Sequence, residues 1–417
     1  MRILILGINF APELVGIGKY TGEMAVHLAM KGYDVKVITV PPYYPHWRIG
    51  EGYSVWCYRK EIVEATRPIN VYRCPLWIPG KLSGIKRLIH LASFTASSLP
   101  VMLYHVLWRP DVVLTVEPPF FCAYQAWLVA RLSGAQSWLH IQDFEIDAAF
   151  DLGIVKSTWA KRWIFSAEQW LLGRFDQVST ISGCMLEKLE VKGVDSGKQL
   201  LFTNWVDTDQ IKPLEHESPM RSELGIRAGE IVALYSGNMG EKQGLEIVIE
   251  AARALTFAVP IRFVMCGHGA AYSRLRVLAE GLENILWIPL QPVKRLNDLL
   301  NLADIHLLPQ RADAADLVMP SKLTGIMASG RPVVATANEG TEVWSVVQGC
   351  GITCAPSDYR AFALNVKSLA MDPARRAALG AAARKYAISH FDKEKILNSF
   401  ESALHYLVTF RQKGNHA

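Results

Sequence analysis

One lysine of this sequence lies where a cation is normally unfavourable. Lys322 follows Pro320 and Ser321 at the start of an expected helix over residues 321–329, and Ser321 is expected to cap that helix. The N-terminal end of a helix carries partial positive charge, so a lysine there is unfavourable unless an anion is bound. Helix N-termini and lysines both bind phosphate groups. The spacing therefore predicts a diphosphate site at Ser321 and Lys322; the alternative is a Lys322 side chain that points into solvent.

Glycine turns follow two expected strands in the same half of the chain. One strand leads into Gly237 and Asn238, with Lys242 shortly after, and another leads into Gly267. Glycine lets a backbone approach a ligand closely, and Lys242 is a second candidate cation for a diphosphate. An exposed lysine at a helix start is the alternative interpretation of Lys242. These turns predict a ligand-binding edge on the second half of the chain.

A glycine-containing loop also follows the first expected strand, and it ends at Gly16 and Gly18. A dinucleotide-binding fingerprint needs G-x-G-x-x-G directly after the strand and an acidic residue at the end of the second strand. Here the glycines come late, and the segment 35–40 contains no acidic residue. An NAD site is therefore not expected. The backbone N–H groups of the loop could still bind a phosphate or a sugar; a turn without a ligand is the alternative.

Polar side chains mark the ends of two further expected strands. His140 and Asp143 lie at the carboxyl end of the strand over residues 136–141, and Glu339 and Glu342 follow another strand. Ligands of open α/β sheets bind at the carboxyl ends of the strands, so all four are candidates for substrate contacts. For His140 and Asp143, the alternative is a polar residue that only caps the strand.

The pair Asp207 and Asp209 imitates a D-x-D metal-binding motif. It lies in a polar stretch between structured segments, and a Mg²⁺ site needs carboxylates together with substrate phosphates. We predict no metal site and no requirement for a metal or another cofactor.

Short β-branched runs alternate with longer helical patterns along the chain, which is typical of parallel α/β sheets. In the first half, strands are expected over residues 3–8, 35–40, 112–116, 136–141 and 177–181. In the second half, they are expected over residues 231–236, 261–266, 285–288, 305–308 and 333–336. The pattern predicts two Rossmann-like domains whose parallel sheets face an interdomain cleft.

The domain boundary is expected near a polar, proline-containing stretch over residues 207–228. We predict a first domain over residues 1–205 and a second over residues 206–392, with a C-terminal helix over residues 393–411 packing back on the first. A chain of 417 residues suits two α/β domains of about 200 residues each.

Composition indicates a packed globular protein, with 50% hydrophobic and 20% charged residues. The net charge of +5 is compatible with anionic partners such as nucleoside diphosphates or phospholipid surfaces. Seven scattered cysteines indicate buried thiols in a reducing cytosol. The N-terminus is interpreted as a strand and not as a signal peptide. The segment 91–108 is apolar, but its polar residues and Pro100 argue against a membrane span.

Taken in order, the motifs resemble those of the retaining GT-B glycosyltransferases of family 4, over nearly the whole length. The motifs are Phe10-Ala-Pro-Glu-Leu-Val-Gly-Ile-Gly-Lys-Tyr20, Asn204-Trp-Val-Asp207, Tyr235-Ser-Gly-Asn-Met-Gly240, Val264-Met-Cys-Gly-His-Gly269, Asn301-Leu-Ala-Asp-Ile-His-Leu-Leu-Pro309 and Ala328-Ser-Gly-Arg-Pro-Val-Val-Ala335. More narrowly, the chain is similar to the colanic acid exopolysaccharide glycosyltransferases of enteric bacteria.

This resemblance implies a sugar transfer from a nucleotide-sugar donor, such as GDP-fucose, to a lipid-linked saccharide. It implies that Gly16, Gly18 and Lys19 belong to an acceptor-side loop. It also implies that a residue near His140 or Asp143 contacts the sugar or the acceptor, and Asp143 is favoured. Glu339 and Glu342 are then candidates for the donor hydroxyls.

The sequence departs from the family pattern at the donor site. Two glutamates that the family usually carries fall on Leu317 and Gly325, and its usual arginine and lysine fall on Asn238 and Gln243. The phosphate contacts are therefore expected at Ser321, Lys322 and Lys242. Two alternatives stay open. A sugar-nucleotide epimerase shares this fold architecture, and the missing glutamates would suit a non-catalytic member of a polysaccharide assembly complex.

A lipid-linked acceptor implies peripheral contact with the inner face of the cytoplasmic membrane, and we expect no contact with nucleic acid. Basic residues and tryptophans favour such an interface. The candidate residues are Trp47, Arg48, Trp56, Arg59, Lys81, Lys86 and Arg87, with the apolar stretch 88–108. A buried helix with ordinary surface charge is the alternative.

Overall fold

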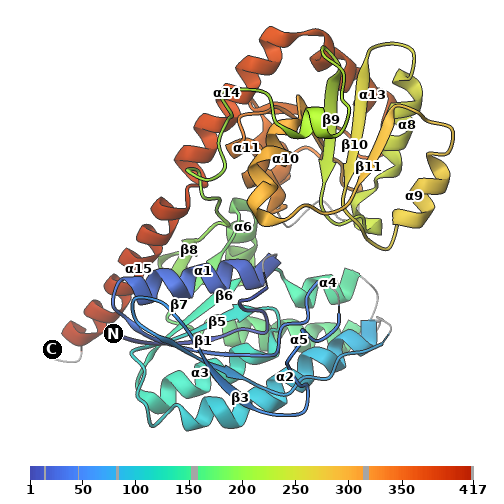
Figure 1. Ribbon diagram of the computed structural model, residues 1–417. Helices are drawn as coiled ribbons and strands as arrows, with labels where there is room; N and C mark the ends of the chain where they lie inside the picture. The colour runs from blue at the N-terminus through green and yellow to red at the C-terminus, as the bar shows by residue number, and fades with distance from the viewer. Residues whose placement is uncertain (14–15, 46, 81–83, 152–157, 313–318, 415–417) are drawn as a thin grey trace. The chain divides into compact units, whose positions relative to one another are not determined.

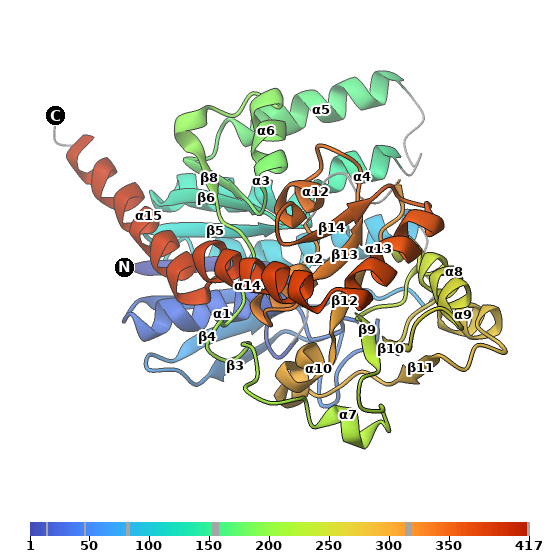
Figure 2. The ribbon, with the colours of Figure 1, turned by 90° about the horizontal axis from the view of Figure 1, so that it is seen from above.

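The computed structural model describes residues 1–13, 16–45, 47–80, 84–151, 158–312 and 319–414. The chain folds into two compact units, one formed by Met1–Thr203 with Leu397–Ala417, the other by Asn204–Ile396. Each unit contains a largely parallel sheet with helices on both faces (Figures 1 and 2).

The sheet of the first unit has the strand order β3-β4-β2-β1-β5-β6-β7-β8 in the described part of the chain. Its strands are β1 (Arg2–Leu6), β2 (Asp34–Thr39), β3 (Arg59–Val63), β4 (Ile69–Arg73), β5 (Val112–Glu117), β6 (Gln136–Ile141), β7 (Gln177–Thr180) and β8 (Gln199–Leu201). All neighbours pair in parallel except β3 and β4, which are antiparallel. The order reverses between β1 and β5, and ligands of such sheets bind at this switch point.

Helices of the first unit cover the two faces of this sheet. They are α1 (Gly16–Met30), α2 (Gly84–Tyr104), α3 (Phe121–Ser133), α4 (Glu145–Asp151), α5 (Thr158–Leu172), α6 (Gly183–Val191) and α15 (Lys393–Gly414), with a 3-10 turn η1 (Ser196–Lys198). Figure 1 shows α1 and α15 on one face and α2 and α3 on the other. The central strands β5 and β6 are buried at every position, and β1 is buried at every position except Arg2, as expected for a parallel sheet covered on both sides.

The sheet of the second unit has the order β11-β10-β9-β12-β13-β14, and all its pairs are parallel. Its strands are β9 (Ile231–Ser236), β10 (Ile261–Cys266), β11 (Ile285–Ile288), β12 (Ile305–Leu308), β13 (Val333–Thr336) and β14 (Gly351–Cys354). The order reverses between β9 and β12, so the loops after these two strands flank the switch point.

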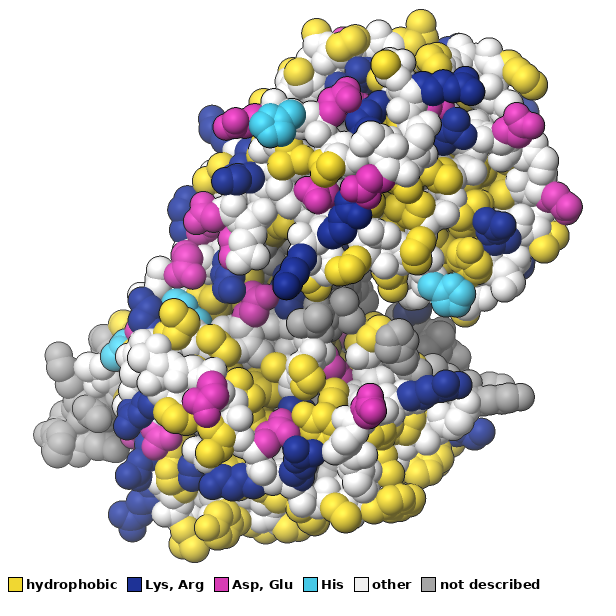
Figure 3. Space-filling view, in the orientation of Figure 1, with side chains coloured by type: hydrophobic (Ala, Val, Ile, Leu, Met, Phe, Trp, Pro, Cys, Tyr) yellow, Lys and Arg dark blue, Asp and Glu magenta, His cyan; other side chains and the backbone are white. Residues whose placement is uncertain are grey.

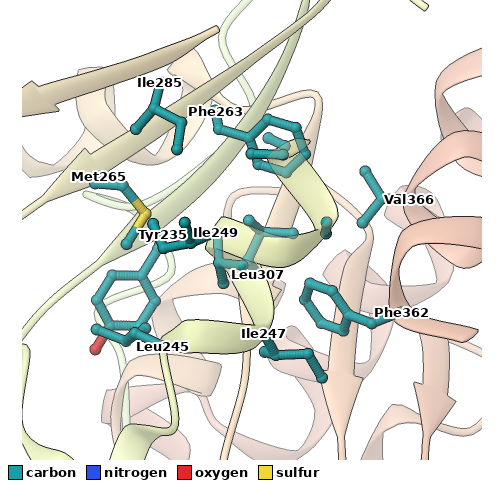
Figure 4. Close-up of a cluster of buried hydrophobic side chains, with 14 of the residues drawn as sticks. Tyr235, Leu245, Ile247, Ile249, Phe263, Met265, Ile285, Leu307, Phe362 and Val366 are labelled. Carbon is teal, nitrogen blue, oxygen red and sulfur yellow. The ribbon is translucent and has the colours of Figure 1, made fainter. Parts of the chain in front are cut away.

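Helices of the second unit are α7 (Met220–Glu223), α8 (Glu246–Leu255), α9 (Tyr272–Leu278), α10 (Leu296–Leu302), α11 (Lys322–Ala328), α12 (Glu342–Val347), α13 (Tyr359–Met371) and α14 (Pro373–His390), with 3-10 turns η2 (Glu241–Gln243) and η3 (Val293–Arg295). Side chains from β9, β10, α8 and α13 form one core cluster, in which Tyr235, Phe263 and Phe362 are fully buried (Figure 4). This core fixes Tyr235 below the carboxyl end of β9.

The C-terminal helix α15 contributes aromatic packing to the first unit. Phe400 stacks on Phe202 with ring centroids 4.3 Å apart, and it meets Trp138 edge-on at 4.9 Å. Tyr33 donates to Glu401 at 2.8 Å. These contacts explain why residues from Leu397 onward belong to the first unit.

Among the described residues, no helix has the length and hydrophobicity needed to cross a bilayer. The apolar helix α2 contains Pro100, and its exposed positions include Lys86 and Arg87.

Candidate functional site

Two glycine turns meet at the carboxyl edge of the second sheet. Gly237 follows β9 with φ +136°, and Gly267 follows β10 with φ +141°. A Cβ atom on Gly267 would lie 1.9 Å from the carbonyl oxygen of Gly237, so no larger residue fits there without a shift of the backbone. The Met239 amide donates to the His268 carbonyl at 3.0 Å, which holds the two turns together.

Lys322, the first residue of α11, reaches this edge from the other side of the switch point. Its ammonium lies 4.4 Å from the centroid of the Tyr235 ring and donates to the Tyr235 hydroxyl at 3.3 Å. That hydroxyl donates in turn to the Asn238 carbonyl at 2.5 Å. The Lys322 ammonium also lies 3.8 Å from the position of a Cβ on Gly237. The side chain therefore points at the glycine turn.

The Lys322 ammonium lacks a carboxylate partner among the residues that the structure describes, since none of the ion pairs includes it. Burial lowers its pKa to about 8. An ammonium has three donors, and one is used on Tyr235. The remaining donors, beside a turn without side chains, suit an anion such as a phosphate group.

The expected capping role of Ser321 is wrong. Ser321 has helical backbone angles, φ −55° and ψ −24°, and its side chain makes no capping hydrogen bond. A capping side chain needs an extended backbone to fold back onto the helix amides. The Ser321 side chain is exposed instead, beside Lys322.

Three other predicted donor-site residues lie in the turns and helix starts of the same sheet edge. Lys242 is exposed in η2, where its carbonyl accepts from the Arg311 amide at 3.1 Å. Glu339 is exposed in the turn after β13, and the half-buried Glu342 begins α12, which Thr341 caps. All three follow the carboxyl ends of strands of this sheet, as Gly237 and Lys322 do.

Leu317 and Gly325 stand where the family usually carries two glutamates. Leu317 lies outside the described residues. Gly325 lies inside α11, where a Cβ would contact Leu300 at 3.4 Å. Asn238 folds over the neighbouring turn, because a Cβ on Gly269 would meet its Oδ1 at 2.7 Å.

The first carboxylate of the D-x-D pair is engaged in a local turn. Asp207 accepts hydrogen bonds from the amides of Asp209 and Gln210, at 3.1 and 2.9 Å. This is an Asx-type turn, in which the aspartate side chain bonds to backbone two or three residues further on.

The first unit places His140 inside β6, where only 3% of it is exposed. Its ring nitrogens lie 2.9 Å from Ser179 Oγ and 2.9 Å from Gln142 Nε2, and the ring packs against Phe202. Burial lowers the pKa of His140 to about 3. His140 is therefore neutral and held by protein groups, whereas Asp143 lies half-buried in the loop that follows β6.

The loop after β1 is organised by a buried glutamate that the sequence analysis did not single out. Glu13 Oε1 accepts from the amides of Tyr43 and Tyr44, at 3.0 and 2.9 Å, and Oε2 accepts from Asn9 at 2.8 Å. Burial raises the pKa of Glu13 despite these bonds. A Cβ on Gly18 would lie 2.6 Å from Glu13 Oε2, so Gly18 permits this approach.

Gly16 and Lys19 belong to the same loop and helix start. Gly16 has φ +61° and faces the Tyr44 ring, and the Lys19 ammonium lies 5.0 Å from the Tyr20 ring centroid. Backbone amides and a lysine thus lie at the carboxyl end of β1, next to the switch point of the first sheet.

Two more carboxyl groups that the sequence analysis did not single out, Glu117 and Glu145, lie at the same edge. Glu117 ends β5 and is 1% exposed, and Glu145 begins α4 and is 8% exposed. A polar side chain at the carboxyl end of a strand is the same signal that identified Asp143, so Glu117 could have been found by that rule.

Two Rossmann-like units, each with polar groups and glycine turns at the carboxyl edge of its sheet, define the GT-B class of nucleotide-dependent transferases. Solved structures agree on the fold. Sucrose-phosphate synthase from Thermosynechococcus elongatus matches with a TM-score of 0.74 and 17% identity, over 100% of both chains. Anabaena HepE, solved in complex with UDP, matches with a TM-score of 0.71 and 15% identity, over 97% of this chain and 100% of that one.

The family follows from the sequence comparisons. Residues 15–205 match the Glycosyl transferase 4-like domain, and residues 217–386 match Glycosyl transferases group 1. The chain is 41% identical to the putative colanic acid biosynthesis glycosyl transferase WcaI of Escherichia coli (strain K12), over 96% of this chain and 98% of that protein. It is 24% identical to glycogen synthase of Mycobacterium tuberculosis, over 95% and 92% of the two chains. The chain belongs to the group 1, family 4 glycosyltransferases and is a glycosyltransferase, which confirms the expected family and fold class.

Proposed function

We propose that this enzyme transfers a sugar from a nucleoside-diphosphate donor to a lipid-linked oligosaccharide during exopolysaccharide synthesis, with retention of configuration. Colanic acid is the proposed polysaccharide, because the 41% identical relative is named for its biosynthesis. A GDP-sugar, with GDP-fucose as the first candidate, is the proposed donor.

The observation that carries this proposal is the Lys322 ammonium beside the Gly237 turn. This ammonium has no carboxylate partner in the described part of the chain. It lies beside Gly237, which has no side chain to fill the space next to the backbone. A diphosphate leaving group needs charge stabilisation as the bond to the sugar breaks. We assign Lys322 and Ser321 to the diphosphate, with Gly237, Asn238, Lys242 and Gly267 around it, and Glu339 and Glu342 to the donor hydroxyls.

On the first unit, we assign Asp143 to the acceptor hydroxyl or to the positive charge that develops on the sugar. His140 is buried and neutral, so we assign it a positioning role through Gln142, which follows β6 immediately before Asp143. Gly16, Gly18 and Lys19 are proposed to contact the acceptor. In this scheme the donor phosphate itself accepts the acceptor proton.

Peripheral contact with the cytoplasmic face of the membrane is the second part of the proposal. The helix α2 exposes Ile85 and Ile89 next to Lys86 and Arg87, and Leu103 near its C-terminal end. Lys81 lies outside the described residues. Figure 3 shows hydrophobic side chains mixed with lysine and arginine on the visible face of the first unit. Exposed apolar groups next to basic groups suit an anionic bilayer surface.

A tryptophan face on α5 supports the same contact. Trp159, Trp163 and Trp170 are 70%, 64% and 47% exposed, and Arg174 lies over the Trp170 ring. Tryptophan favours the membrane interface. Trp47, in contrast, is half-buried against Tyr43 and His90, so it is omitted from the proposed contact; Trp56, Arg48 and Arg59 are exposed.

A donor panel with and without acceptor tests the function. Purified enzyme would receive GDP-, UDP- and ADP-sugars, first alone and then with lipid-linked oligosaccharide extracted from a polysaccharide-producing strain. Release of nucleoside diphosphate that depends on the acceptor, with a radiolabelled lipid product, supports the proposal. Formation of an epimer or of free sugar without acceptor dependence indicates the epimerase, and binding without turnover of any donor indicates the non-catalytic assembly role.

A further inference from the structure

Two neighbouring strand-end loops of the first unit are tied together beside Asp143. β5 and β6 are parallel, with Glu117 opposite Ile141. Past this pair, the Gln142 amide donates to the Glu117 carbonyl at 3.0 Å, and the Phe120 amide donates to Glu145 Oε2 at 2.9 Å. The loop that carries Asp143 is thus anchored to the β5 loop on both sides of Asp143.

The two carboxyl side chains at this junction, Glu117 and Glu145, are buried. Both carboxyl oxygens of Glu117, and Oε1 of Glu145, are buried without a hydrogen-bond partner among the described residues. A buried carboxylate without partners is unstable relative to its neutral, protonated form. Glu117, whose two carboxyl oxygens both lack such a partner, is therefore expected to keep its proton.

The charged groups around Glu117 favour the same state. Burial is the largest cause that raises the pKa of Glu117 well above its ordinary value, and the negative charges of Glu145, Glu168 and Asp143 raise it further, while Lys192 opposes them. Burial also raises the pKa of Glu145, although its hydrogen bond from the Phe120 amide and the charge of Arg87 oppose this, and the charge of Asp143 adds to it.

We propose that Glu117 and Glu145 are positioning residues for Asp143. Glu145 fixes the junction through its bond to the Phe120 amide, and Glu117 is a neutral buried acid that lets the Asp143 loop close over it. This inference rests on the proposed role of Asp143 in transfer. Neither side chain needs to touch the substrate, because both act through the loop over residues 142–145.

Hydrogen exchange and turnover of full-length variants test this inference together. In Glu145→Ala the acceptor for the Phe120 amide is lost, so exchange in peptides over residues 118–124 and 142–150 should be at least about tenfold faster. Turnover of the active sugar nucleotide should fall at least about fivefold, with the donor KM within about twofold. Glu145→Gln keeps an oxygen acceptor for that amide, so both readouts should lie nearer the wild type.

Asp176→Ala is the matched control. Asp176 Oδ2 accepts from the Ser137 amide at 2.8 Å, which is a similar carboxylate–amide link at the opposite end of β6. Its loss should speed exchange near Ser137 and leave the 142–150 peptide protected.

The two readouts separate two kinds of failure. Unchanged exchange over residues 142–150 in Glu145→Ala overturns the inference, whatever the turnover. If Glu145→Ala exchanges faster over residues 142–150 but turns over like the wild type, the link between the junction and catalysis is overturned. If Asp143→Asn also turns over like the wild type, the proposed role of Asp143 in transfer fails. Equal defects in Glu145→Gln and Glu145→Ala overturn the assignment of the Phe120 bond as the essential contact.

Discussion

The ammonium of Lys322 lies 3.3 Å from the hydroxyl oxygen of Tyr235, and its position over the ring at 4.4 Å holds it at the end of β9. The two residues are 87 positions apart in the sequence. The contact keeps a long, mobile side chain in place before any ligand arrives, which reduces the entropy lost on binding.

Replacing Lys322 by alanine should weaken the binding of a nucleoside diphosphate by about 1.5–3 kcal/mol, the range for a hydrogen bond to a charged group. Titration calorimetry with GDP and UDP measures this loss. Lys242→Ala, at an exposed lysine of the same edge, is the comparison and should have the smaller effect. An unchanged affinity in Lys322→Ala would remove this residue from the site.

Donor binding should weaken in alkaline solution. The pKa of Lys322 is lowered to about 8 by burial, and only the protonated ammonium attracts a diphosphate. As the pH rises above about 8, the dissociation constant should increase by up to about tenfold per pH unit. The same titration with Lys322→Ala corrects for protonation of the ligand. A wild-type profile parallel to that of the variant up to pH 9.5 contradicts this assignment.

Asp143→Asn keeps the shape of the side chain and removes its charge. Turnover should fall at least about tenfold while donor affinity stays within a few-fold, because Asp143 is assigned to transfer and not to the diphosphate. Steady-state kinetics together with calorimetry on one preparation distinguish the two effects. Wild-type turnover would mean that Asp143 is only a structural residue of the loop.

Glu117→Gln should stabilise the fold more at pH 8 than at pH 5. The pKa of folded Glu117 lies well above its ordinary value of 4.5, whereas the unfolded chain loses this proton near that value. As pH rises from about 4.5 towards the folded pKa, the folded state therefore loses up to about 1.4 kcal/mol per pH unit relative to the unfolded state. Glutamine cannot ionise and avoids this loss.

Thermal unfolding at pH 5 and pH 8 measures the effect of Glu117→Gln. The exposed Glu187 on α6 provides a control, Glu187→Gln, for which no pH-dependent gain is expected. An equal change of Tm at both pH values would show that Glu117 titrates in its ordinary range.

Membrane contact should depend on both the basic and the tryptophan surfaces of the first unit. Flotation with vesicles that contain anionic lipid should recover the protein at low salt, and recovery should fall as salt is raised. Lys86→Gln with Arg87→Gln should weaken binding by about 1 kcal/mol per residue, and Trp159→Ala with Trp163→Ala should weaken it in neutral vesicles as well. Phe257→Ala, at a fully exposed aromatic of the second unit, is the control. Absence of binding to anionic vesicles at low salt contradicts the proposed contact.

All ten strands that the sequence pattern predicted are present in the structure. They could be found because parallel strands buried on both faces are short, mostly apolar runs. It missed β3, Arg59–Val63, which has three charged residues and pairs antiparallel at the sheet edge. It also missed β4 (Ile69–Arg73), β8 (Gln199–Leu201) and β14 (Gly351–Cys354). Of the four missed strands, β3, β8 and β14 lie at sheet edges and β4 lies next to one. Edge strands face water and lose the apolar signal that identifies central ones.

The candidate site was harder to predict than the fold. Glycine turns and the lysine at the start of α11 could be located from spacing alone, but the contact of Lys322 with Tyr235 depends on the sheet order, which brings β9 next to β12. Ser321 failed as a cap because its backbone is already helical. The burial of His140 against Phe202 joins β6 to the segment after β8, a tertiary contact that local pattern does not encode.

The stacking of Phe400 on Phe202 has a consequence for how the protein is made. The strands of the first unit's sheet are synthesised before the second unit, yet Phe400, whose ring contacts Trp138 and Phe202, is synthesised after it. The second unit, Asn204–Ile396, is continuous and has all its residues before the first unit does. The first unit is therefore expected to be completed after the second, and a nascent chain that stops before Leu397 should leave that aromatic surface open to chaperones.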